Sequence, residues 1–109
     1  MTWSDFEKVE LHVGQIIDVI DFPKVRKLAY TLLVDFDDEI GICKSSAQIT
    51  DLYNASNLKG KKVIAVVNFP KKQIGKFMSE CLVTGLHNEH GEVVLCVPDG
   101  EVLLGTKLL

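Results

Sequence analysis

Runs of apolar, largely β-branched residues recur along the chain, and the first of them, from Val9, alternates with polar residues as a strand buried on one face does. These runs predict strands at about 9–22, 28–36, 39–44, 62–69 and 81–85, and a turn at 87–91 leads into a further apolar run at 93–97. Gly14 interrupts the first run in the manner of a β-bulge, so we expect one long bent strand there.

Two short helices are predicted beside these strands. Ser4 and Glu7 have the spacing of a capping box, with Trp3 ahead of the cap, and predict a helix over about 4–8. The serines at 45 and 46 offer a second N-cap, and the apolar residues after them have helical spacing. They predict a helix over 45–53, followed by a polar loop through 54–57.

Five strands with one helix between the third and the fourth is the order expected for an OB-fold, although another small barrel or an α+β domain is equally compatible with the periodicity. The predicted fold class is therefore all-β, as a five-stranded OB-fold barrel with short N- and C-terminal extensions. A chain of 109 residues, 47% of them apolar, fits a single domain over 1–109. A domain of this size commonly gains burial by dimerising.

Charge is distributed unevenly along the chain. The formal net charge is −3, yet the stretch between residues 40 and 79 contains seven lysines and a single acidic residue, Asp51. Such asymmetry predicts one basic face on a mildly acidic protein, so a nucleic-acid partner stays open.

The sequence lacks the residue patterns expected of membrane-spanning, secreted, metal-binding and catalytic proteins. The longest apolar runs are far shorter than the roughly 20 residues that span a bilayer, and the N-terminus does not read as a secretory signal, so we expect a cytoplasmic protein without membrane insertion. Cys43, Cys81 and Cys96 form no CxxC pair and should be reduced. His87 and His90 lack further ligands, so no metal is expected. Because no acid, base and nucleophile set can be named, we expect a binding protein without a cofactor rather than an enzyme.

The stretch 68–80 carries the most informative pattern for binding. Pro70 ends a strand, and three lysines then alternate with Ile74, Phe77 and Met78. Lysines beside apolar side chains suit a single-stranded nucleic acid and equally an extended peptide. In the alternative interpretation, Ile74 and Phe77 close one end of the barrel and the lysines are merely solvated. A second basic set, Arg26, Lys27 and Lys44, would flank the same face of an OB-fold, where Ser45, Ser46 and Gln48 could donate hydrogen bonds.

Three long motifs carry a family resemblance: KSSAQIT at 44–50, GKKVIAVVNFP at 60–70, and KQI followed by FMSE up to residue 80. They resemble the CsaA family of export-related molecular chaperones, within the wider tRNA-binding-domain family that is also appended to some tRNA synthetases. The resemblance covers nearly the whole chain. It implies an OB-fold homodimer that holds preproteins unfolded for export, with peptide in a surface pocket and elements at both chain ends forming the dimer contact.

Individual positions follow from that resemblance. By analogy with the tRNA-binding members, Lys27, Asn68, Lys71, Lys72 and Ser79 would contact RNA. Two departures stand out: Cys43 occupies a position that is basic in many relatives, and Ser79 is followed by Glu80 rather than Gly, which places an acid near any phosphate.

The sequence therefore predicts a CsaA-like chaperone that binds unfolded preproteins, with a tRNA-binding protein as the alternative and the export motor as a possible further partner. The predicted ligand-binding residues are Arg26, Lys27, Lys44, Ser45, Ser46, Gln48, Asn68, Phe69, Lys71, Lys72, Lys76, Phe77, Met78 and Ser79. The predicted dimer-interface residues are Trp3, Phe6, Val102, Leu103, Leu104, Leu108 and Leu109.

Overall fold

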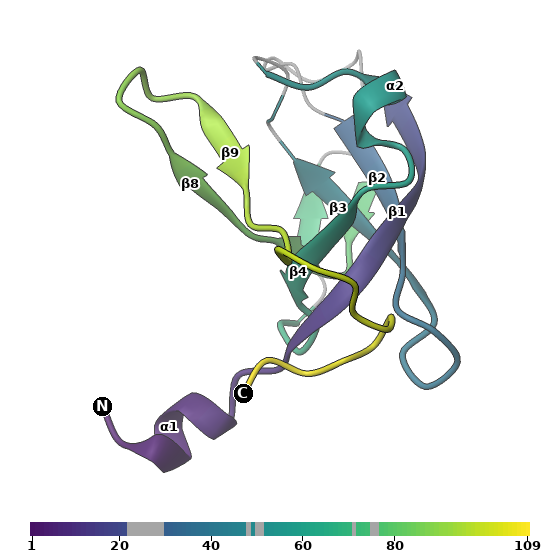
Figure 1. Ribbon diagram of the computed structural model, residues 1–109. Coiled ribbons are helices and arrows are strands. Elements are labelled where there is room, and N and C mark those ends of the chain that lie inside the picture. Colours follow the sequence, from purple (N-terminus) through teal and green to yellow (C-terminus); the bar gives the residue numbers. More distant parts are fainter. Residues whose placement is uncertain (22–29, 48, 50–51, 71, 75–76) are drawn as a thin grey trace.

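A computed structural model describes residues 1–21, 30–47, 49, 52–70, 72–74 and 77–109, with the backbone alone at residues 21, 72–74, 77 and 78. Short strands dominate it, and the two helices each have only about one turn (Figure 1). In chain order the elements are α1 (Trp3–Glu7), β1 (Leu11–Asp21), β2 (Tyr30–Asp35), β3 (Ile42–Ala47), α2 (Ala55–Leu58), β4 (Lys62–Val66), β5 (Lys72–Ile74), β6 (Phe77–Ser79), β7 (Leu82–Val83), β8 (Gly85–His87) and β9 (Val93–Leu95).

One antiparallel sheet with the strand order β3-β2-β1-β4-β7 forms the body of the molecule. The long strand β1 organises it, because its first half pairs with β4 and its second half pairs with β2. This sharing bends the sheet around on itself (Figure 1). The predicted all-β OB-fold barrel is confirmed, with the short helix α2 between the third and fourth strands.

The barrel closes where the outer edge of β3 meets the last residue of β6 and the residue after it. The Glu80 N–H donates to the Lys44 carbonyl at 2.7 Å, and the Ser46 N–H donates to Ser79 Oγ at 3.4 Å. We call this meeting line the seam and define it by Lys44, Ser46, Ser79 and Glu80. The contact is short, so the barrel is nearly but not fully closed by backbone pairing.

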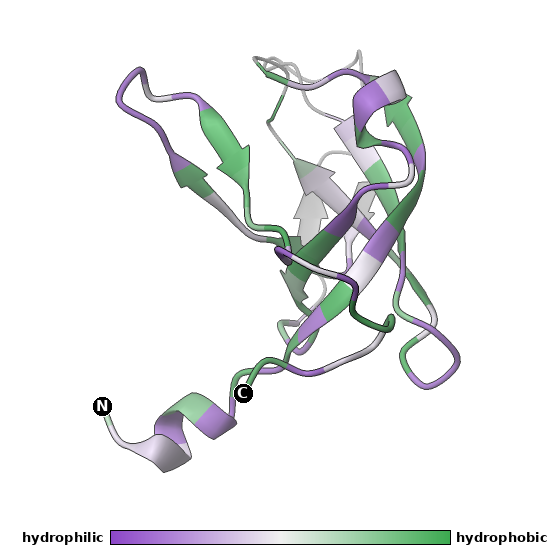
Figure 2. Cartoon of the chain, in the orientation of Figure 1, coloured by the Kyte–Doolittle hydropathy of each residue, from purple (hydrophilic) through white to green (hydrophobic). Residues whose placement is uncertain are grey.

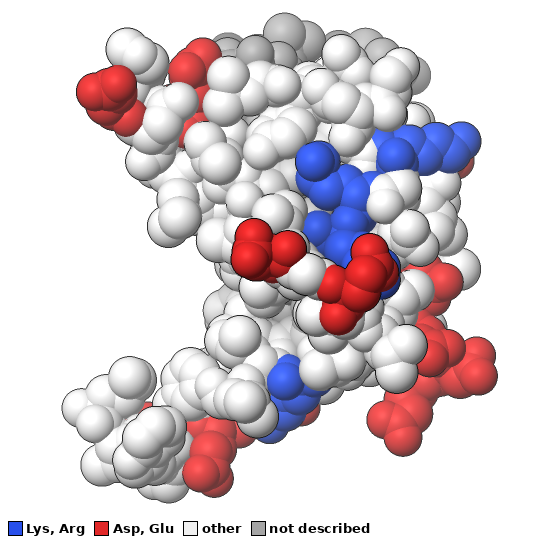
Figure 3. Space-filling view, viewed as in Figure 1, with Lys and Arg blue, Asp and Glu red and all other residues white. Residues whose placement is uncertain are grey.

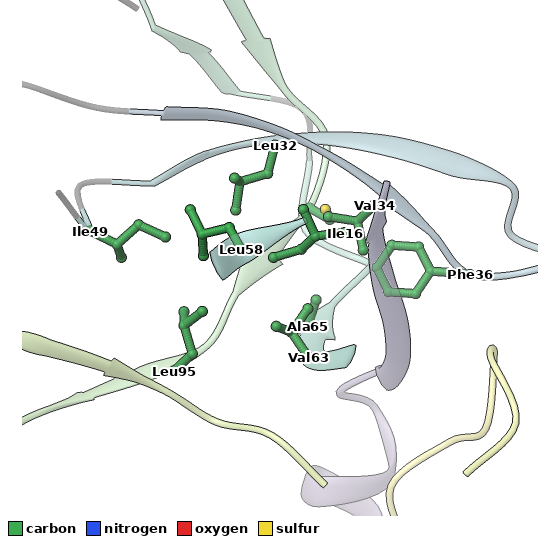
Figure 4. Close-up of a cluster of buried hydrophobic side chains, with 10 residues drawn as sticks. Ile16, Leu32, Val34, Phe36, Ile49, Leu58, Val63, Ala65 and Leu95 are labelled. Carbon is green, nitrogen blue, oxygen red and sulfur yellow. The ribbon is translucent and has the colours of Figure 1, made fainter. Parts of the chain in front are cut away.

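Apolar side chains from several strands and α2 form the core, with Phe36 the largest of those that are fully buried (Figure 4). Gly14 lies against this core without forming a bulge, because the register of β1 against β2 shifts between Ile16 and Asp18. A Cβ at position 14 would lie 2.6 Å from Val34 Cγ1, so the glycine serves close packing. The predicted bulge at Gly14 is therefore wrong, and the irregularity in β1 lies a few residues later.

Both predicted helix starts are also wrong. Helix α1 is capped by Thr2, whose Oγ1 accepts the Asp5 N–H at 3.2 Å, so the capping box lies two residues earlier than Ser4 and Glu7. Ser45 and Ser46 do not cap a helix, since β3 continues through Ala47. The expected polar loop forms α2 instead, because the side chains of Asn54 and Asn57 each accept the other's backbone N–H.

Two hairpins extend the barrel beyond the predicted strands. β5 and β6 pair within the stretch that the sequence presented only as lysines alternating with apolar residues. β8 and β9 pair around the predicted turn at 87–91 and project from the barrel (Figure 1). The chain between Gly85 and Leu95 thus leaves the main sheet, which shortens the two predicted strands there.

The two ends of the chain lie side by side at one end of the barrel (Figure 1). The C-terminal segment runs along β1 beyond the end of β2: the Val13 N–H donates to the Thr106 carbonyl at 3.0 Å and the Leu108 N–H donates to the Leu11 carbonyl at 2.8 Å. This segment therefore covers an edge of β1 that would otherwise have unpaired backbone groups.

Candidate ligand-binding surface

Strand alternation sets which side chains of β3 face outward. Ile42 and Lys44 are exposed, whereas Ser45 between Lys44 and Ser46 is 1% exposed and points into the barrel. Ser45 was predicted to meet a ligand, but its burial places its hydroxyl beside the Cys81 thiol instead. Lys44 is thus the exposed polar residue of this strand, and Ser46 on the same face is half-buried.

Lys44 and Glu80 form the centre of the seam. The Lys44 backbone N–H donates to Glu80 Oε1 at 3.0 Å, while the Lys44 carbonyl accepts from the N–H groups of Glu80 at 2.7 Å and Cys81 at 3.2 Å. On the outer edge of β3, the backbone N–H of Lys44 is therefore hydrogen-bonded to a carboxylate, and its backbone carbonyl is hydrogen-bonded to backbone N–H groups. A negative charge lies within hydrogen-bond distance of the strand edge as a result.

Ser79 supplies the second side-chain contact of the seam. Its hydroxyl accepts the Ser46 N–H at 3.4 Å and donates to the Cys81 carbonyl at 3.3 Å. Ser79 and Ser46, both predicted to meet a ligand, are brought together here and are half-buried. They hold the barrel closed, and only part of their surface faces solvent.

Apolar side chains flank the seam on its outer side. Ile42 on β3 is 57% exposed and Leu82 on β7 is 49% exposed, and these two strands are neighbours across the closure. Phe69, after the end of β4, is 54% exposed. Ile42 and Leu82 were missed from the sequence because an alternating pattern does not say which edge of a strand ends at the barrel closure.

The thiol of Cys81 lies behind the seam. Burial, followed by the nearby Cys43 and Glu80, raises the pKa of this thiol to about 12, and the Ser45 hydroxyl opposes the shift. Such a thiol stays protonated and is a poor nucleophile. Within the described part of the chain, no group of three or more His, Cys, Asp or Glu residues is arranged to hold a metal ion.

Comparison with known proteins identifies the family to which this barrel belongs. Residues 11–107 match the family described as "Putative tRNA binding domain". The crystal structure of chaperone CsaA from Bacillus anthracis str. Ames is 41% identical, with a TM-score of 0.92 over 100% of this chain and 98% of that one. The CsaA chaperone protein from Picrophilus torridus is 48% identical, with a TM-score of 0.92 over 100% and 99% of the two chains.

The chain is a CsaA-type member of the tRNA-binding-domain family. It is also 32% identical to the methionine tRNA ligase of Methanocaldococcus jannaschii over 105 residues, which are 96% of this chain but 16% of that enzyme. The chain thus corresponds to a small part of the curated ligases that it matches.

The other predicted ligand residues of this CsaA-type chain lie in different parts of the molecule, and not all of them are within the described residues. Asn68 is used internally, because its amide donates to the Lys8 carbonyl at 2.7 Å and accepts the Glu10 N–H at 3.1 Å. These bonds tie the connection after α1 to the end of β4. Lys72, Phe77 and Met78 lie in the β5–β6 hairpin, whose backbone alone is described. The predictions at Arg26, Lys27, Gln48, Lys71 and Lys76 fall outside the described residues.

The lysines from the end of α2 to the first residue of β4 form a basic patch with acidic groups beside it on the face shown in Figure 3. Lys62 Nζ donates to the Val102 carbonyl at 2.8 Å and lies 3.2 Å from Glu101 Oε2, and Lys61 Nζ lies 5.9 Å from the centre of the Tyr53 ring. Part of the predicted basic stretch therefore fastens the C-terminal segment and covers an aromatic ring.

Three of the predicted dimer residues, Trp3, Phe6 and Leu109, lie together at the two adjacent chain ends, where hydrophobic ribbon continues to the C-terminus (Figure 2). Leu103 and Leu104 instead border a separate hollow beside Gln15 and Lys62. Trp3 is 80% exposed and Leu103 is 83% exposed, and Leu108 and Leu109 are exposed as well. Phe6, Val102 and Leu104 are half-buried. An apolar hollow of about 360 Å³ lined by Leu11, Ile64, Val102 and Leu108 adjoins one of about 560 Å³ lined by Trp3 and Phe6, and Leu109 borders both.

In the described part of the chain, the helices are too short and too polar for any of them to cross a membrane.

Proposed function

We propose that this chain binds unfolded polypeptide as a cytoplasmic, CsaA-like chaperone that acts as a homodimer. The observation that carries the proposal is its likeness, along the whole chain and at 41% and 48% identity, to two structures that are each named a CsaA chaperone. Barrels of this kind bind many classes of ligand, so the fold alone would not identify polypeptide as the ligand.

The chemistry of the seam supports polypeptide as the ligand. Exposed Ile42 and Leu82 offer apolar contacts, while Lys44 and Glu80, each two residues away from one of them along the chain, add both signs of charge. An unfolded chain presents apolar, acidic and basic side chains in irregular order, and a mixed surface can contact all three. A regular polyanion gains less from such a surface.

The test is suppression of aggregation of an unfolded presecretory polypeptide by a stoichiometric amount of the protein. Replacing Ile42 and Leu82 by Ser should reduce this suppression, whereas Leu86→Ser, at an exposed position on the β8–β9 hairpin, should leave it intact. The proposal is abandoned if the wild type has no effect on aggregation. Equal losses in the double variant and in the Leu86 control would refute the assignment to the seam.

Homodimerisation is the second part of the proposal. Trp3 and Leu109 expose apolar area beside the two hollows at the chain ends, and burial against a second copy would remove this area from water. Light scattering at micromolar concentration should give twice the mass of the chain, and the double substitution of Trp3 and Leu109 by Ser should shift the mass toward one chain. A wild-type monomer would contradict this part alone.

Binding of tRNA is the second candidate, favoured by the match of residues 11–107 to the tRNA-binding-domain family. It predicts that affinity falls steeply with salt and that replacing Lys71 and Lys72 with Ala lowers the slope by about one unit for each lost phosphate contact. Salt-independent binding would rule out this candidate.

A further inference from the structure

The carboxylate of Glu80 is held at the centre of the seam. Its Oε1 accepts the Lys44 N–H at 3.0 Å, and the Glu80 N–H donates to the Lys44 carbonyl at 2.7 Å. The second bond fixes the backbone of Glu80 beside Lys44, and the first holds the carboxylate at the Lys44 N–H. Its negative charge is therefore a fixed part of the surface next to the exposed side chain of Lys44.

The donor that Glu80 occupies is of a kind that proteins present to phosphate. Lys44 combines a backbone N–H on the outer edge of β3 with an exposed ammonium group, and both kinds of donor contact phosphate oxygens in nucleic-acid complexes. A phosphate that approaches this edge meets a carboxylate oxygen already at the N–H, and the two negative charges repel each other.

An unfolded polypeptide meets no such barrier. Its carbonyl groups are neutral, and its basic side chains are attracted by the carboxylate while its apolar side chains can contact Ile42 and Leu82. The same fixed charge thus opposes one class of ligand and tolerates the other.

We propose that Glu80 is a specificity-determining residue that disfavours phosphate at the seam and so directs this surface toward polypeptide rather than tRNA. The inference rests on the proposed function, because it concerns ligand choice at the same surface. Unit charges about 6 Å apart in a largely aqueous surrounding repel strongly enough to weaken tRNA binding about three- to tenfold.

The experiment titrates tRNA and an unfolded presecretory polypeptide separately into the wild type and Glu80→Gln. Glutamine keeps an oxygen that can accept the Lys44 N–H and removes the charge. We expect tRNA to bind this variant about three- to tenfold more tightly at about 0.05 M salt, with a smaller gain at about 0.5 M, where charges are screened. The polypeptide affinity should not increase.

Two matched variants separate a local effect from a change of net charge. Glu89→Gln removes the same unit charge from the turn of the β8–β9 hairpin, where the side chain is 88% exposed, and should leave tRNA binding at the wild-type level. Glu80→Asp keeps the charge and should show no gain. If Glu80→Gln lacks a cooperative thermal transition, Glu80→Ala replaces it with the same expectation.

The outcomes for the two proposals are distinct. Unchanged tRNA binding in the folded neutral variants, or an equal gain in Glu89→Gln, would overturn the role of Glu80 even if the wild type binds polypeptide. Failure of the wild type to bind polypeptide would instead refute the proposed function, while a gain in tRNA binding confined to neutral Glu80 variants would still support the repulsion of phosphate at the seam.

Discussion

Gly14→Ala tests whether close approach of β1 to the core shapes this barrel. The added Cβ would lie 2.6 Å from Val34 Cγ1, and 2.7 and 2.8 Å from Cε1 and Cδ1 of Phe36. Real Cβ atoms essentially never come within 3.0 Å of such neighbours. Val34 is 0% exposed and Phe36 is 1% exposed, so neither side chain can move into solvent to relieve the overlap.

The cost follows from these contacts. Overpacking a well-filled core by one methyl group typically costs about 1–3 kcal/mol. Because two buried side chains must shift together, we expect the upper part of that range, about 2–3 kcal/mol, which corresponds to a fall in Tm of roughly 10–15 °C for a domain of this size.

Urea unfolding followed by circular dichroism measures the effect, and Gly100→Ala is the matched control. A Cβ at Gly100 would meet nothing within 4 Å, so that variant should stay within about 0.5 kcal/mol of the wild type. If Gly14→Ala were as stable as Gly100→Ala, the approach of β1 to Val34 and Phe36 would not be as tight as the structure shows.

Three further changes test the ends of the barrel and the thiol behind the seam. Asn68→Ala removes the hydrogen bonds to Lys8 and Glu10, so unfolding free energy should fall by about 1–2 kcal/mol, and proteolysis near α1 should become faster; an unchanged cleavage rate would contradict this. Hydrogen bonds from Lys107 and then His12 lower the pKa of Glu10, so its contribution to stability is present above the ordinary value of 4.5 and is lost as the pH falls through the folded value. Urea titrations over this acid range should show a weaker loss in Glu10→Gln than in the wild type, and parallel curves would refute the ion pair. Iodoacetamide at mildly alkaline pH should modify Cys43 and Cys96 before Cys81, whose pKa is raised to about 12 by burial; mass spectrometry that found Cys81 modified first in the folded protein would count against that burial.

The positions of the main strands along the chain were predictable, because apolar β-branched runs mark segments that are buried on at least one face. The run that begins near Val9 and the run that ends at Phe36 became β1 and β2, which pair as an OB-fold requires. Bulges and caps were less predictable, since they depend on neighbours far away in the chain. The bulge prediction at Gly14 failed because the close approach of this glycine to Phe36 cannot be seen in the sequence. The cap prediction at Ser45 failed because serine, a common capping residue, also occurs in buried strands.

The candidate surface was predictable only as a list of residue types. Ser46 and Ser79 were both chosen from the sequence, yet their meeting at the seam depends on how β3 lies against the end of β6. Asn68 was chosen as a ligand residue, whereas its amide binds the backbone of Lys8 and Glu10. A polar side chain that closes a fold has the same appearance in sequence as one that binds a ligand.

The way in which the seam closes bears on how a client could be bound. β3 is the edge strand of the main sheet, and an open strand edge invites pairing with other chains. Here the outward N–H groups of Lys44 and Ser46 are met by the side-chain oxygens of Glu80 and Ser79, one of them charged. A client strand would have to displace these oxygens and leave a carboxylate without that hydrogen bond, which costs about as much as a charged hydrogen bond contributes. We therefore expect a client to be held by side-chain contacts across the outer surface of the seam rather than by addition of a strand to β3, so that the protein can expose apolar residues without pairing edge to edge with the chains it binds.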